Sequence, residues 1–115
     1  MSMTELVRII EDFGKGVRAY NECSRACRDQ LKVQSDTAAA YFLLAIVAEK
    51  FVDTYDDQPL SSPIAEAEFK RFKGYVEQFE ATERASDPSA KLDTLNRIAD
   101  EIANHKLLLE ETSFQ

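Results

Sequence analysis

Apolar side chains recur at alternating intervals of four and three residues along the first 31 positions of this chain. The series is Leu6, Ile10, Phe13, Val17, Tyr20, Ser24, Cys27 and Leu31. Every member except Ser24 is apolar or aromatic. Residues at this spacing share one face of a helix, whereas a strand requires alternation at every second position. The pattern therefore predicts one long amphipathic helix from about Met3 to Val33.

A second helix is predicted from Ser35 or Asp36, either of which can cap a helix, to about Tyr55. Its middle, AAAYFLLAIVA, is apolar on every side, which predicts the most buried helix of the fold. The helix has to end before Pro59, because proline cannot donate the next backbone hydrogen bond.

Two more helices are predicted to begin where a polar residue precedes proline. Ser62 is the expected N-cap of the third helix and Asp87 that of the fourth. Four helices with short connections predict an all-α fold, an antiparallel four-helix up-and-down bundle in which residues 1–115 form a single domain. Helical hairpins that complete such a bundle by dimerisation are the alternative.

The charge balance limits the classes of partner that the chain is expected to bind. The chain has 14 basic and 21 acidic side chains, a net charge of -7, which argues against nucleic-acid binding and against docking on an anionic membrane. The longest uncharged stretch, Thr37 to Ala48, is shorter than the roughly 20 residues of a membrane span, and residues 1–12 lack the uncharged core of a signal peptide. We therefore expect a cytoplasmic protein with no nucleic-acid or membrane partner.

Three side chains are candidates for metal or redox chemistry. Cys23 and Cys27 lie four residues apart, on one side of the first predicted helix, and His105 is the only histidine. Zinc normally takes four ligands, and two cysteines on an intact helix are poorly aligned for a disulfide. We interpret both cysteines as small core residues and expect no cofactor.

His105 is also the only side chain expected to titrate near neutral pH, and it follows Glu101 by four residues, which predicts a carboxylate–imidazole pair on the fourth helix. Bundles that hold two iron ions need a Glu-x-x-His motif on each of two helices, which this chain lacks. We interpret His105 as a residue at the edge of the bundle, and no enzymatic activity is expected.

Gly14 and Gly16 lie inside the first predicted helix. Because a phosphate-binding loop needs GxxxxGK[ST] between a strand and a helix, they do not indicate nucleotide binding. Glycine destabilises a helix interior by about 1 kcal/mol relative to alanine, so the pair indicates a kink or a close helix contact. Since the apolar series continues through Phe13 and Val17, we expect a helix that is bent at most and that tolerates alanine at either glycine.

Arg18, Arg25 and Lys32 form a line of cations at seven-residue intervals, with Arg28 nearby. Such a line could contact an acidic partner. Acidic residues four positions away can compensate it, and the expected pairs are Glu11–Lys15, Arg18–Glu22 and Arg25–Asp29. We therefore interpret the line as a solvated helix face.

The chain carries more aromatic and leucine side chains than the inner faces of four helices accommodate. Surplus apolar surface is typical of an oligomer or partner interface. The interface candidates are Tyr41, Phe42, Phe72, Tyr75, Leu107 and Leu108.

These patterns together support the hypothesis of a small acidic, non-enzymatic interaction or regulatory protein that forms a homodimer and engages another protein. The alternative is a small-molecule-binding or metal/redox bundle that uses Cys23, Cys27 and His105. A ligand pocket of roughly a few hundred Å³ would be required for small-molecule binding. Its candidate lining residues are Tyr20, Ser24, Tyr41 and His105.

Overall fold

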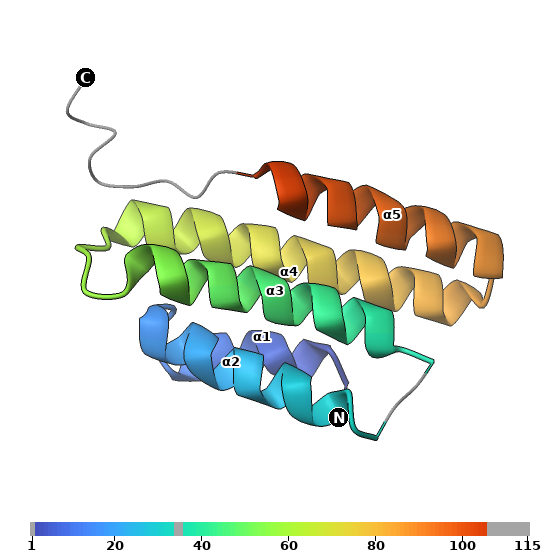
Figure 1. Cartoon of the computed structure of the whole chain (residues 1–115), viewed down its shortest axis with the longest axis horizontal. Coiled ribbons are helices and arrows are strands. Elements are labelled where there is room, and N and C mark those ends of the chain that lie inside the picture. Colours follow the sequence, from blue (N-terminus) through green and yellow to red (C-terminus); the bar gives the residue numbers. More distant parts are fainter. Residues whose placement is uncertain (1, 34–35, 106–115) are drawn as a thin grey trace.

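The computed structural model describes residues 2–33 and 36–105, and all regular secondary structure in these ranges is helical. The five helices are α1 (Thr4–Asp12), α2 (Val17–Gln30), α3 (Ala38–Tyr55), α4 (Ser62–Ala85) and α5 (Pro88–Asn104). Consecutive helices run in opposite directions (Figure 1). The predicted all-α fold is confirmed, but the described residues form five helices instead of the expected four.

The predicted single helix from Met3 to Val33 is wrong. α1 ends at Asp12, and Gly14 follows with a φ of 94°, in the left-handed region that favours glycine. The N–H of Lys15 donates to the carbonyl of Ile10 at 2.9 Å, and the N–H of Gly14 donates to that of Glu11 at 3.2 Å. This pair of bonds is the Schellman motif, which terminates a helix and lets the chain reverse.

The predicted starts of the last two helices are correct to within one residue. Ser61, not Ser62, is the N-cap of α4, and its side chain accepts from the N–H of Ile64 at 3.5 Å. Asp87 caps α5 as predicted, accepting from the N–H of Ser89 at 3.0 Å. α3 ends at Tyr55 as expected but begins at Ala38, without a side-chain cap.

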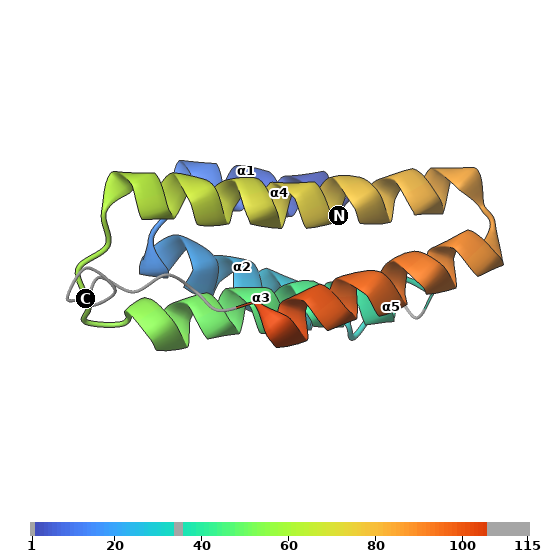
Figure 2. The same cartoon turned by 90° about the horizontal axis from the view of Figure 1, so that it is seen from above.

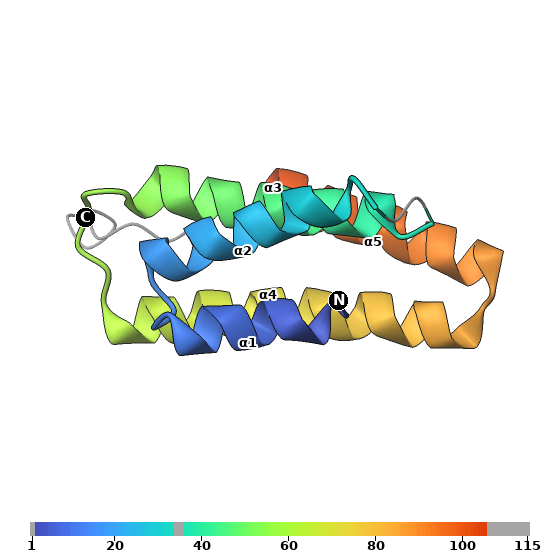
Figure 3. The same ribbon diagram turned by 90° about the horizontal axis from the view of Figure 1, so that it is seen from below.

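The five helices form two layers. α1 and α4 lie side by side in one, and α2, α3 and α5 form the other (Figures 2 and 3). Aromatic rings fill the space between the layers: Tyr20 of α2 stacks on Phe51 of α3 with centroids 3.9 Å apart, and Phe72 of α4 meets Tyr20 edge-on at 6.0 Å. Within the described ranges, no helix combines the length and the apolar character needed to cross a membrane.

The turn at Gly14 yields a test with a matched control. We expect Gly14→Ala to lower the free energy of unfolding by about 1 to 2 kcal/mol, because a Cβ disfavours a positive φ. Gly16 has a φ of -108°, which alanine adopts without strain, but it is the N-cap of α2, so Gly16→Ala should lower stability only by the smaller loss of a glycine N-cap. Urea unfolding measures both, and equal effects would contradict the assigned turn.

Candidate functional site

The two cysteines are buried in the core. Cys23 and Cys27 face the core from α2 and both have an exposed fraction of 0%. A hydrogen bond with Cys27, followed by burial, raises the pKa of the Cys23 thiol well above its usual range. Metal ligation and thiol redox chemistry need a thiolate, so this environment opposes both. No group of three or more His, Cys, Asp or Glu side chains suited to a metal ion occurs in residues 2–33 and 36–105.

His105 pairs with a different carboxylate from the one predicted. It is the C-cap of α5, and its Nε2 lies 3.3 Å from both carboxylate oxygens of Glu68 on α4, a residue that is only 6% exposed. The predicted partner, Glu101, lies instead 3.8 Å from Arg97. The His105 N–H still donates to the Glu101 carbonyl at 2.8 Å, but its side chain contacts α4, which spacing along a single helix does not predict.

The surroundings of this pair are too small for a substrate. Beside it, a pocket of about 20 Å³ is lined by Val47, Lys50, Glu68, Arg71, Tyr75, Ile102 and His105. That volume holds little more than one water molecule. Lys50 Nζ also donates to the backbone carbonyl of Ile102 at 2.9 Å. These contacts fasten the end of α5 to α3 and α4, which is a structural role.

The candidate pocket residues do not converge. Tyr20 lies in the aromatic core, Ser24 donates to Glu49, and His105 lies against Glu68. A larger hollow of about 370 Å³ is an open groove lined by Ala67, Lys70, Arg71, Gly74, Tyr75, Gln78 and Glu101, and it includes none of the four candidates. The described residues therefore do not support the predicted ligand pocket.

Three of the six interface candidates are buried by the chain itself. Tyr41, Phe72 and Tyr75 have exposed fractions of 2%, 0% and 3%. Tyr41 points into the core from α3, whereas its neighbour Phe42 points outward and is 44% exposed. Leu107 and Leu108 lie outside the described residues, so Phe42 is the candidate that the structure places at the surface.

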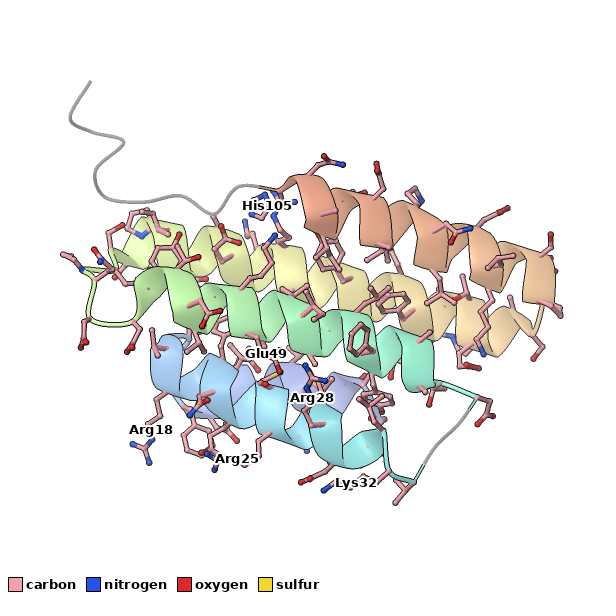
Figure 4. The ribbon with its side chains drawn as sticks, viewed as in Figure 1. Arg18, Arg25, Arg28, Lys32, Glu49 and His105 are labelled. Atoms are coloured by element: carbon pink, nitrogen blue, oxygen red, sulfur yellow. The ribbon has the colours of Figure 1, made fainter. Side chains whose placement is uncertain are left out.

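The Phe42 ring lies beside a network of hydrogen bonds that joins α2 to α3. The Arg28 guanidinium donates two hydrogen bonds to the Glu49 carboxylate, at 2.9 and 2.8 Å, and Ser24 Oγ donates to the same carboxylate at 2.9 Å. The guanidinium carbon also lies 5.4 Å from the centroid of the Phe42 ring. Figure 4 shows Arg28 turned toward Glu49. The Arg28 hydrogen bond is the largest cause of a lowered Glu49 pKa.

The predicted line of cations is present on α2, but its compensating pairs differ. In Figure 4, Arg18, Arg25 and Lys32 point away from the other helices. Arg25 pairs with Glu22 at 3.2 Å, Lys32 pairs with Asp29 at 3.7 Å, and Arg18 lies 5.1 Å from the centroid of the Phe13 ring. Lys15 pairs with Glu66 of α4 instead of Glu11, because it lies in the turn after α1. Arg25 and Lys32 thus pair with acidic residues three positions away, not four as predicted.

Exposed apolar side chains gather around the same helix. Among the described residues, the large apolar side chains that are exposed are Phe13 (39%), Phe42 (44%), Leu92 (57%) and Val33 (72%). Phe13 precedes α2, Val33 follows it, and Phe42 lies against its Arg28. We define the α2 surface by these three apolar residues together with Arg18, Glu22, Arg25, Arg28, Asp29 and Lys32.

The α2 surface also differs in charge from the chain as a whole. Residues 17–33 contain four basic and two acidic side chains, a net charge of +2, in a chain whose net charge is -7. The α2 surface therefore combines arginine and exposed aromatic side chains with a local charge opposite to that of the whole chain. Sequence analysis singled out Phe42 and the cations separately. Local spacing does not place them together, because Arg28 and Phe42 are 14 positions apart and lie on different helices.

The Glu68–His105 contact predicts a graded loss of stability. His105→Ala leaves a buried carboxylate without this partner and should lower the free energy of unfolding by about 1 to 3 kcal/mol. His105→Gln retains a donor and should lose much less. Urea unfolding distinguishes the two variants, and a His105→Ala protein as stable as the wild type would contradict the structural role assigned to the pair.

The Arg28–Glu49 pair predicts a pH-dependent effect. Because the folded state lowers the Glu49 pKa from 4.5, the ionised carboxylate adds stability above that pH, and this stability is lost as the pH falls through the lowered value. We expect Glu49→Gln to have a lower urea midpoint than the wild type at neutral pH. As the pH falls through the lowered Glu49 pKa, the two midpoints should approach each other. An unchanged difference in acid would contradict the prediction.

Comparison with known proteins finds no matching family model, no similar curated protein and no similar solved structure. Function therefore has to be inferred from the side chains of this molecule, among which those of the α2 surface are the most distinctive.

Proposed function

We propose that this chain is a non-enzymatic cytoplasmic interaction protein that self-associates as a dimer through the α2 surface. The observation that carries the proposal is the grouping of exposed side chains: three of the four exposed large apolar residues in the described ranges flank one helix. Leu92, the fourth, lies on α5. We propose that these three side chains, together with the polar residues of α2, contribute to one interaction site.

The composition of the α2 surface suits an interface. Aromatic and arginine side chains are enriched among the residues that contribute most to protein–protein binding. Arg28 is held by two hydrogen bonds to Glu49 and lies over Phe42, so neither side chain has much conformational freedom left to lose on binding. A preorganised aromatic–arginine pair of this kind favours association.

Electrostatics favours the α2 surface as the place where two copies meet. Two chains of net charge -7 repel each other through most of their surfaces. The repulsion is reduced where the local charge is positive, as it is along residues 17–33. Because this stretch contains both signs of charge, it can also complement a second copy of itself.

The catalytic alternatives have less support. His105 is engaged with Glu68 beside a water-sized pocket, and both cysteines are buried as thiols. The larger groove along α4 is open and lined mainly by polar side chains of that helix. None of these features brings a nucleophile, a base and a substrate-sized cavity together among the described residues. Binding of another protein is the function that the exposed side chains support best.

A matched pair of variants tests self-association. Phe42 and Leu92 are both exposed and both helical, but only Phe42 belongs to the α2 surface. We expect wild type and Leu92→Ser to have twice the mass of one chain by light scattering at millimolar concentration. Phe42→Ser should have the mass of one chain while keeping its helical circular dichroism. Monomeric wild type would contradict the proposal, as would dimers of equal strength in both variants.

A further inference from the structure

The outermost side chains of α2 alternate in charge. Arg18, Glu22, Arg25, Asp29 and Lys32 follow one another at intervals of four, three, four and three residues. At 3.6 residues per turn they form a single stripe along the helix. The opposite side of α2 carries the buried Ala19, Tyr20, Cys23 and Cys27, so the stripe lies on the line farthest from the core.

We propose that two copies of this chain pack α2 against α2 in antiparallel orientation, about a two-fold axis that passes between Arg25 and Asp29. This inference rests on the proposed self-association and adds its partner residues. In this register Arg25 of each copy meets Asp29 of the other, and Glu22 of each copy meets Lys32 of the other. Every one of these four contacts joins opposite charges.

Other arrangements of the two helices are less favourable. In a parallel pair each residue of one chain faces the same residue of the other chain. Like charges therefore face each other along the whole stripe. An antiparallel pair with its axis at Arg25 places Arg18 against Lys32. A register shifted by one helical repeat, with Arg18 opposite Asp29 and Glu22 opposite Arg25, is complementary in charge. This shifted register, however, moves the two-fold axis away from Arg28 and therefore also away from Phe42.

The position of Phe42 selects between the two complementary registers. Phe42 lies beside Arg28, which is adjacent in sequence to Asp29, so an axis between Arg25 and Asp29 brings the two copies of Phe42 toward the middle of the interface. The charged pairs lie along the line between the two helices, and the two Phe42 rings flank this line on the side of Arg28, near the axis.

Charge reversal with mixing tests this register. Arg25→Glu places two acidic residues opposite each other at both symmetric contacts of its homodimer, and Asp29→Arg places two basic residues there. We expect each variant alone to dimerise about tenfold more weakly than the wild type. In an equal mixture, Glu at position 25 of one chain meets Arg at position 29 of the other, and Asp29 meets Arg25. The mixture should form heterodimers of about wild-type strength.

The readouts are sedimentation velocity for affinity and native mass spectrometry for the one-to-one heterodimer. Both substitutions also remove weak pairs within one chain, Arg25–Glu22 and Lys32–Asp29. Thermal unfolding of each variant therefore establishes that it is folded. Mixing the two variants cannot restore the ion pairs lost within one chain, so rescue by mixing reports contacts between chains. Rescue by mixing supports the register.

Failure of rescue after both variants weaken overturns the register, because the shifted arrangement, with Arg18 opposite Asp29, leaves like charges at half of its contacts in the mixture. Variants that each dimerise like the wild type place the interface away from this stripe and also overturn the inference, while self-association itself stands. A monomeric wild type overturns both proposals.

Discussion

The reversal of the chain at Gly14 is the constraint on which the architecture depends. Had the first apolar series continued as one helix, its two halves would lie on one axis in one layer. The left-handed glycine and its two backbone hydrogen bonds instead turn the chain back, so that α1 packs beside α4 while α2 packs beside α3. This turn allows two short helices to cover two different layers. It also leaves the outer side of α2 exposed at the edge of the molecule.

Polar contacts then fix the ends and edges of the helices. Arg28 and Ser24 connect α2 to Glu49 of α3, and Lys50 and Glu68 hold the end of α5. These groups are titratable or nucleophilic side chains from which a reaction centre could be built. Each is instead engaged with a partner that belongs to the fold. This engagement supports the proposal that the molecule functions through the exposed side chains that flank α2.

Periodicity in the sequence predicts the helices well and their packing poorly. The four-and-three spacing and the Asp87-Pro88 start correctly indicate an all-helical chain, because burial of one face dictates both. The same spacing conceals the break at Gly14: α1 and α2 each bury their own part of the series, so the pattern continues although the helix does not. Gly14 itself was the available signal, since a glycine one position past the end of a helix is a frequent terminator.

The interface residues illustrate the same limit. Adjacent Tyr41 and Phe42 cannot both face the core, but sequence does not say which of them faces out. The structure buries Tyr41 and exposes Phe42. Phe72 and Tyr75 are both buried because α4 faces helices of the other layer over a wide arc. The Arg28–Glu49 network depends on a contact between helices, which no local spacing predicts.

The claim that the α2 surface is where the molecule associates is tested most directly by its amide spectrum on dilution. In ¹⁵N-labelled wild-type protein, chemical shifts that change with concentration identify the residues that meet another copy. The account predicts such changes along α2 and around Phe42, with little change along α5. Concentration-dependent shifts confined to α4 and α5, or shifts that do not change from micromolar to millimolar concentration, would contradict it.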